Sequence, residues 1–210
     1  MKIMQEFDTI SKSLPQNTGG FDSRSIISML DLTILDQNAA PAQIIDLANT
    51  AQIYSPAAIC IYPEHYKFIP NNTLNCKKAT VINFPDGQDT DEQVLSLIEE
   101  IATQVDEIDY VFPYHLYLDG ETQKALTRYK NAYVFAKQFG LTVKVILETG
   151  ILPSLETIYH LSRQVIDLGC DFIKTSTGKT PIGATLPAAF AILKAIKAST
   201  CGIKMISNKH

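Results

Sequence analysis

The residues with the clearest chemical potential lie in the stretch Asp171–Lys179, which reads Asp-Phe-Ile-Lys-Thr-Ser-Thr-Gly-Lys. Its aromatic and β-branched residues favour a strand, and its Thr-Gly-Lys end favours a turn. Lys174 would then lie in an apolar strand, where its charge is costly unless it is paired or its pKa falls. A lysine with a lowered pKa is a nucleophile toward carbonyl carbons and can form a Schiff base. The structural alternative is a lysine at a strand end whose amine extends to water.

The end of the same stretch is suited to an anion. Ser176, Thr177 and Gly178 are small residues whose backbone N–H groups could hold a phosphate. Gly178-Lys179-Thr180 is similar to the end of a P-loop, but that motif requires a glycine five positions before Gly178, where Ile173 stands. The sequence therefore excludes a P-loop NTPase.

Strand and helix patterns alternate through the rest of the chain. A helix and loop are predicted over 1–20, a helix end leading into a short strand over 25–35, and a short helix broken by Pro70 over 63–74. The other predicted strands cover 57–62, 79–84, 107–112, 141–147 and 202–206, and the other helices cover 41–54, 91–103, 123–139, 153–168 and 186–198. This alternation predicts an α/β protein with a parallel sheet. About seven strands is close to the eight of a TIM (β/α)8 barrel. A doubly wound sheet is the alternative, although its Gly-rich first turn is missing.

Polar residues recur on these strands, whereas buried parallel strands are usually continuous apolar runs. They are Asp31, Cys60, Asn83, Asp109, Lys144, Lys174 and Lys204, with Glu148 just after the fifth strand. Alternate positions stay apolar, as Val143, Val145 and Leu147 show for the fifth strand. We therefore predict a barrel with an apolar outer face and one polar cluster inside, near the carboxyl ends of the strands, where barrel active sites form.

Each of these polar residues also has a purely structural interpretation. Cys60 could be a small core residue, and Asp109 could cap a turn. Lys144 and Glu148 are four residues apart, so they could share a strand face and form a structural ion pair. Their recurrence on strand after strand favours a reaction site, because several lysines and acids together make a poor core.

Length and composition exclude several classes of protein. The 210 residues, 46% hydrophobic and 19% charged, fit one globular domain. A net charge of −4 gives no basic surface for nucleic acid, and no apolar run is long enough to cross a membrane. The cysteines are far apart and no signal peptide is visible, which predicts reduced thiols in a cytoplasmic protein. The histidines, His65, His115, His160 and His210, show no metal-ligand spacing.

Several short segments together form a recognisable pattern. They are Leu30-Asp31-Leu32-Thr33, Ala58-Ile59-Cys60-Ile61-Tyr62-Pro63, Asn83-Phe84-Pro85, Glu107-Ile108-Asp109, Val111-Phe112-Pro113-Tyr114, Lys144-Val145-Ile146, Glu148-Thr149-Gly150 and the stretch Asp171–Lys179. In these segments the chain resembles deoxyribose-phosphate aldolase, a family of class I aldolases with the TIM-barrel fold. The resemblance covers most of the chain after about residue 25. We therefore expect an N-terminal extension over 1–24 and a barrel domain over 25–210.

The resemblance implies a role for each candidate site residue. Lys174 would be the Schiff-base lysine, Asp109 the acid that moves protons through a water, and Lys204 a second lysine whose charge lowers the pKa of Lys174. The residues expected to contact the substrate or its phosphate are Gly178, Lys179, Thr177, Cys60 and Asp31, with Lys144 and Glu148 in support. The implied reaction cleaves 2-deoxy-D-ribose 5-phosphate to glyceraldehyde 3-phosphate and acetaldehyde, without a cofactor or metal.

The chain departs from the family pattern after Lys204. There the family has a Gly-Gly pair with a basic residue, a helix, a last strand with a Gly-Ser-Ser phosphate contact and a final helix. Here only residues 205–210 follow. We therefore expect an incomplete barrel that associates as a homo-oligomer, for which a dimer is the simplest form. The alternative function is that of a catalytically weak or inactive relative, acting as an interaction protein or as a fragment completed by a partner.

Overall fold

The computed structural model describes residues 2–13, 20, 22–70 and 73–206. Its seven strands form one parallel sheet in which the spatial order follows the chain order. The strands are β1 (Asp31–Ile34), β2 (Ala58–Ile61), β3 (Lys77–Ile82), β4 (Glu107–Val111), β5 (Thr142–Ile146), β6 (Phe172–Lys174) and β7 (Gly202–Lys204). The helices are α1 (Lys2–Ser13), α2 (Ser23–Ile27), α3 (Pro41–Tyr54), the 3-10 helix η1 (Pro63–Phe68), α4 (Asp91–Ile101), α5 (Tyr114–Leu118), α6 (Thr122–Gln138), α7 (Leu155–Leu168) and α8 (Leu186–Ile196).

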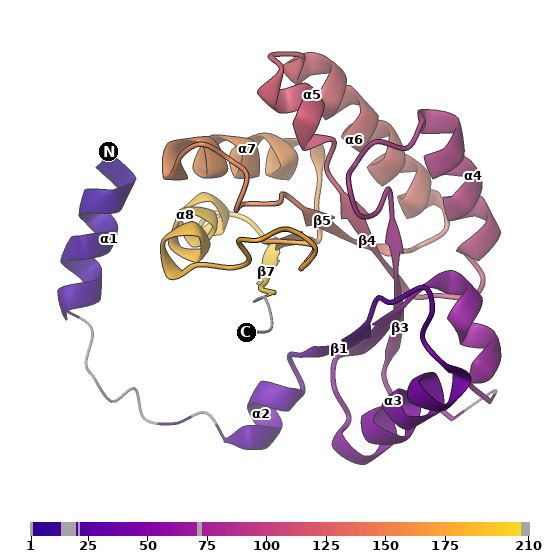
Figure 1. The fold of residues 1–210 in the computed structure, drawn as a ribbon. Helices are drawn as coiled ribbons and strands as arrows, with labels where there is room; N and C mark the ends of the chain where they lie inside the picture. Colours follow the sequence, from indigo (N-terminus) through magenta and orange to yellow (C-terminus); the bar gives the residue numbers. More distant parts are fainter. Residues whose placement is uncertain (1, 14–19, 21, 71–72, 207–210) are drawn as a thin grey trace.

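The sheet is curled, and helices α3, α4, α6, α7 and α8 lie around its outer side (Figure 1). Within the described part of the chain, β1 pairs with β2 alone and β7 with β6 alone, so the sheet has two edges. This is an incomplete barrel of the TIM type, as predicted. The doubly wound alternative is wrong, because the strand order runs from β1 to β7 with no reversal at a switch point.

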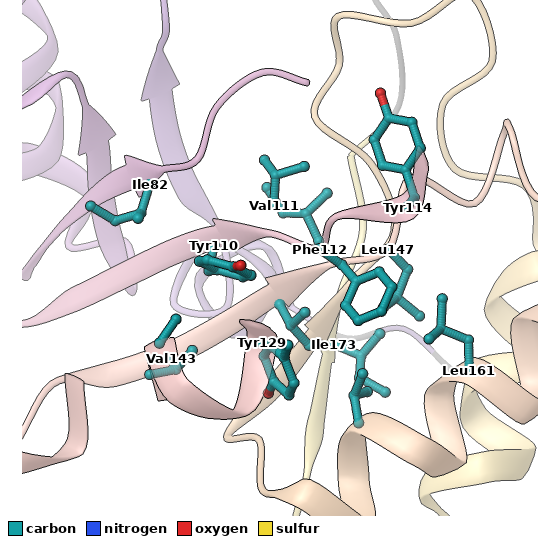
Figure 2. Packing of buried hydrophobic residues seen from close by; sticks show 14 of the residues in the cluster. Ile82, Tyr110, Val111, Phe112, Tyr114, Tyr129, Val143, Leu147, Leu161 and Ile173 are labelled. Carbon is teal, nitrogen blue, oxygen red and sulfur yellow. The ribbon is translucent and has the colours of Figure 1, made fainter. Parts of the chain in front are cut away.

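The outer face of the sheet carries the main hydrophobic core. Tyr110 of β4 packs against Tyr129 of α6, with ring centroids 5.9 Å apart. Figure 2 shows these rings together with Val143 of β5 and Ile173 of β6, which belong to the same cluster. Burying side chains of this size stabilises the fold by about 1.5–3 kcal/mol each. Because side chains alternate along a strand, the residues between them, such as Asp109, face the interior of the curl.

Hydroxyl caps fix where the helices that flank the site begin. Thr90 Oγ1 accepts a hydrogen bond from Gln93 N at 3.2 Å, and Gln93 Oε1 accepts one from Thr90 N at 2.8 Å. This reciprocal box makes Thr90 the N-cap of α4. Ser154 Oγ accepts a hydrogen bond from Thr157 N at 3.0 Å and so caps α7, and the helix starts at Leu155, two residues later than predicted.

Other boundaries also differ from the predictions. The helix α5 was not predicted, because five residues after Pro113 are too few to show a helical period. β3 begins two residues earlier than predicted, at Lys77, and β7 ends at Lys204. At the start of the chain, α1 packs on α7 and α8 (Figure 1). Residues 14–19 of the predicted loop, and His210, lie outside the described residues.

Candidate active site

The interior of the curl holds a buried ion pair between Lys174 and Asp109. Lys174 ends β6, and Asp109 lies in the middle of β4. The Lys174 Nζ donates a hydrogen bond to Asp109 Oδ2, and the two residues are 2% and 0% exposed. Cys60 Sγ, on β2, lies 3.6 Å from the same oxygen. Residues from alternate strands therefore meet in one interior layer, as in a TIM barrel.

Lys144 of β5 lies beside this pair, among three carboxylates. Its Nζ is 3.1 Å from Asp109 Oδ1, 3.0 Å from Asp31 Oδ2 and 2.6 Å from Glu107 Oε2. Lys144 is 1% exposed. Three partners offset the cost of burying its charge, which a single ion pair rarely does. Glu107 was not predicted as a site residue, although it is two residues from Asp109 and alternation along β4 places both on one face.

Lys204 connects the two edges of the sheet. It lies on β7, and its Nζ donates to Asp31 Oδ1 at 2.7 Å and to the Met29 carbonyl at 2.9 Å. Asp31 begins β1, so this ion pair joins strands that share no backbone ladder. Gly202, the first residue of β7, leaves room for the ring of Phe172 on β6, because a Cβ at this position would lie 2.4 Å from that ring.

The cluster sets the charge state of its members. Burial alone would raise the pKa of Asp109, but Lys174 and Lys144 lower it to about 2. Burial lowers the pKa of Lys144, and its three carboxylates then raise it well above its usual value. Burial likewise lowers the pKa of Lys174, yet Asp109 and Cys60 outweigh burial and Lys144, so the net shift is upward. This direction is opposite to the lowered Lys174 pKa that the resemblance implies, and it agrees with the other possibility left open by the sequence, a buried lysine whose charge is paired.

A second group of predicted residues lies in the loop after β6. Glu148 Oε2 accepts hydrogen bonds from Thr177 N at 3.1 Å and from Thr177 Oγ1 at 2.5 Å, and Glu148 Oε1 accepts one from Thr180 Oγ1 at 3.0 Å. Glu148 has a φ of 54°, so the chain leaves the line of β5 before this residue. Its side chain thus reaches the loop instead of Lys144, so the alternative interpretation of Lys144 and Glu148 as a structural ion pair is wrong.

The N–H groups of this loop are already in partial use. Thr177 N binds Glu148, and Lys179 N donates to Thr177 Oγ1 at 3.0 Å. The Lys179 amine donates to the Leu35 carbonyl, after β1, at 2.5 Å. Gly178 turns the chain at a φ of 76°, a conformation that glycine adopts without strain. The loop is therefore held rigidly from both sides, by Glu148 and by Lys179.

The predicted residues thus divide into two groups. One hydrogen-bonded or ion-paired network contains Lys174, Asp109, Cys60, Lys144, Asp31 and Lys204. The other contains Thr177, Gly178 and Lys179, three to five residues beyond β6, together with Glu148, two residues beyond β5. A buried amine next to a carboxylate can attack a carbonyl carbon once it loses its proton. In the described residues, no cluster of three or more His, Cys, Asp or Glu side chains could hold a metal ion, and no helix could span a membrane.

The fold and this interior define a barrel-type α/β protein with buried lysines, and comparison with known proteins gives its family. The model of the DeoC/LacD family of aldolases matches residues 25–207. The chain belongs to this family.

Solved structures show the same fold. A deoxyribose-phosphate aldolase from Aeropyrum pernix, described as tetrameric, is 26% identical, with a TM-score of 0.77 over 88% of this chain and 78% of that one. A protein from Coccidioides immitis described as a deoxyribose-phosphate aldolase gives a TM-score of 0.80 at 21% identity, over 97% and 83% of the two chains. A protein from Toxoplasma gondii described as a deoxyribose-phosphate aldolase gives a TM-score of 0.78 at 18% identity, over 90% of this chain and 78% of that one.

Proposed function

We propose that this protein is a class I aldolase that cleaves 2-deoxy-D-ribose 5-phosphate to glyceraldehyde 3-phosphate and acetaldehyde through a Schiff base on Lys174. The observation that carries the proposal is the buried Lys174–Asp109 pair at the end of β6, where a nucleophile and a base lie in direct contact. Membership of an aldolase family supports the reaction class.

Lys174 must lose its proton before it can react, and the site offers a route. Asp109 is the main group that raises the pKa of Lys174, whereas burial and Lys144 both lower it. A substrate that enters between the amine and the carboxylate weakens the effect of Asp109 on the Lys174 pKa. The effects of burial and of Lys144, which lower that pKa, stay in place. The amine then becomes a neutral nucleophile in the presence of its substrate.

The neutral amine attacks the C1 aldehyde, and loss of water gives a protonated imine. Asp109, acting through a water, accepts the proton of the 3-hydroxyl, and the C2–C3 bond breaks. Its electrons enter the imine, which becomes an enamine, and glyceraldehyde 3-phosphate leaves. Protonation of the enamine at C2 gives the acetaldehyde imine, and water then releases acetaldehyde and Lys174. Asp109 can act as the base because Lys144 and Lys174 keep it ionised.

The loop after β6 is the proposed phosphate subsite. It lies beyond the carboxyl end of the strand that carries Lys174, and Lys179 supplies a cation there. Among the described residues the Gly178 N–H has no hydrogen-bond partner, so it can donate to a phosphate oxygen. Glu148 contributes indirectly, because it fixes Thr177 and therefore the path of the loop.

We also propose that the protein acts as a cytoplasmic homo-oligomer, with a dimer as the simplest form and with no nucleic-acid or membrane partner. The proposed association is supported by the apolar surface beside the two sheet edges. Met29 and Leu30, before β1, and Met205, after β7, are about half exposed. Such side chains favour association with another copy. Light scattering that shows a monomer at assay concentration would contradict this part of the proposal.

A coupled assay for glyceraldehyde 3-phosphate tests the reaction. Wild-type protein should release it from deoxyribose 5-phosphate, and Lys174→Met should abolish the release. The matched control is Lys197→Met, at an exposed lysine after α8, which should keep full activity. Equal activity of wild type and Lys174→Met would contradict the proposal.

A further inference from the structure

Two cysteines meet at the end of the sheet opposite the loop after β6. Cys170 precedes β6, Cys201 precedes β7, and their Sγ atoms lie 2.7 Å apart. They are separated by 31 residues in the chain. Neither residue takes part in the reaction proposed above. Both are free thiols in the structure, with Cys170 partly exposed and Cys201 8% exposed.

The backbone around the two thiols holds them in a fixed relation. Gly202 N donates to the Asp171 carbonyl at 2.9 Å, and Phe172 pairs with Gly202 in the ladder of β6 and β7. In this register Asp171, not Cys170, comes opposite Cys201, so the two cysteines are one residue out of step, and the 2.7 Å between their Sγ atoms is what places the thiols within reach of each other. The Tyr129 hydroxyl also fixes the segment before Cys170, by donating to the Gly169 carbonyl at 2.6 Å. The two sulfurs are therefore close enough to react with each other.

We propose that Cys170 and Cys201 form a reversible oxidation site, in which hydrogen peroxide converts the two thiols into an intramolecular disulfide. The thiolate of one cysteine attacks a peroxide oxygen, the O–O bond breaks, and a sulfenic acid and water form. The second thiol attacks this sulfur, an S–S bond forms, the S–O bond breaks, and a second water leaves. The two thiols lose two electrons, which reduce one peroxide to two waters.

The surroundings favour this pair over the other two cysteines. The hydrogen bond from the Cys170 thiol is the largest influence on Cys201 and lowers its pKa, which raises its thiolate fraction. Burial and, more weakly, Asp171 act in the opposite direction, and the Asp171 carboxylate is paired with Lys137 at 2.9 Å. The hydrogen bond with Cys201 and burial raise the pKa of Cys170, so Cys201 is the thiol of the pair that ionises first. Cys60 is fully buried, and burial together with Asp109 raises its pKa far above the usual value. Burial also raises the pKa of Cys76.

The consequence of the bond follows from its position. β7 is an edge strand of three residues, and it carries Lys204 in register with Lys174 of β6. A disulfide at the amino ends of both strands would hold that register and would close a chain loop of roughly 30 residues. A loop of that length should raise the melting temperature by on the order of 5–15 °C.

The test uses the full chain, treated with a small molar excess of hydrogen peroxide and then alkylated without reduction. Peptide mass mapping should show a Cys170–Cys201 cross-linked peptide, with Cys76 still alkylated. The melting temperature should rise, and dithiothreitol should reverse both changes. Cys170→Ser and Cys201→Ser should lose the rise, whereas the control Cys76→Ser should keep it.

Three results would overturn the proposal. One is alkylation of both Cys170 and Cys201 after peroxide treatment. The second is oxidation of each to sulfinic acid without a cross-link, and the third is a cross-link only between two chains. Peptide mapping of the wild-type protein decides among them, so the conclusion does not depend on the stability of the serine variants. None of these results bears on the aldolase reaction.

Discussion

Asp109→Asn tests the site most fully, because Asp109 is paired with two lysines at once. The variant keeps the shape of the side chain but removes a carboxylate that is 0% exposed and in contact with Lys174 and Lys144. Lys144 retains Asp31 and Glu107, whereas Lys174 loses its charged partner. Turnover of deoxyribose 5-phosphate should fall by about 10²–10⁴, the usual contribution of a positioned general base.

The formation of the imine should respond differently. Without Asp109, burial, which is the largest influence, and Lys144 still lower the pKa of Lys174, and Cys60 is left as the group that raises it. The neutral amine is then more abundant at a given pH. Trapping of acetaldehyde on Lys174 with borohydride should persist in the variant, and its midpoint on the pH axis should move downward.

Stability provides an independent measure of the same charge. The pKa of Asp109 is lowered to about 2 in the folded protein, against about 3.9 for an unfolded aspartate. A lowered carboxylate pKa stabilises the fold above the unfolded value, and this stability is lost as the pH falls toward the folded value. The lowered pKa of Asp109 therefore contributes about 2–3 kcal/mol to the free energy of unfolding above the unfolded pKa. The difference in unfolding free energy between wild type and Asp109→Asn should therefore be largest above about pH 4 and shrink toward pH 2.

The assays are steady-state turnover, borohydride trapping from about pH 5 to 10 and urea unfolding. The matched control is Asp167→Asn, which removes a 67% exposed carboxylate paired with Arg163 on the surface of α7. It should leave all three measurements unchanged. Turnover of Asp109→Asn within about threefold of wild type, or a trapping midpoint that moves upward, would refute the roles given to Asp109.

Three further variants test other parts of the site. Glu148→Gln weakens the hydrogen bonds that fix Thr177, so the Michaelis constant for deoxyribose 5-phosphate should rise about 10–100-fold. Trapping of acetaldehyde, which has no phosphate, should stay constant. An unchanged Michaelis constant would show that the loop does not bind the phosphate. Lys204→Met removes the pair with Asp31 and should destabilise the fold by about 1–3 kcal/mol without moving the trapping midpoint; an upward shift would show that Lys204 does lower the pKa of Lys174. Gly202→Ala should lower the free energy of unfolding by about 1–3 kcal/mol, because its Cβ clashes with the Phe172 ring. The control Gly20→Ala places its Cβ in open space and should leave stability unchanged. Equal melting temperatures for Gly202→Ala and wild type would show that the ring can move aside.

The sequence predicted the fold because two periodicities were clear. Alternation along β4 and β5 places Asp109 and Lys144 opposite the apolar residues, and this pattern alone assigns them to the interior. The long amphipathic helices between the strands then require a parallel sheet with an apolar outer face. The edges of elements were less predictable, because caps such as Ser154 act through hydrogen bonds that periodicity does not reveal.

The pairing inside the site could not be predicted in the same way. Whether Lys144 meets Glu148 or Glu107 depends on where β5 ends and on the positive φ of Glu148, a conformation that is uncommon for a residue other than glycine. The contact between Lys204 and Asp31 depends on the curl of the whole sheet, which brings its first and last strands together. The direction of the Lys174 pKa shift depends on contacts of this kind, which link residues far apart in the chain and leave no periodic pattern.

Reductive trapping on the wild-type protein tests the central claim most directly. The protein is incubated with acetaldehyde and borohydride, digested, and mapped by mass spectrometry at every lysine. The site contains three candidate lysines, of which Lys144 is held by three carboxylates and Lys204 by Asp31. We predict a reduced two-carbon adduct on Lys174 alone among them. An adduct on Lys144 or Lys204, with Lys174 unmodified, would contradict the account.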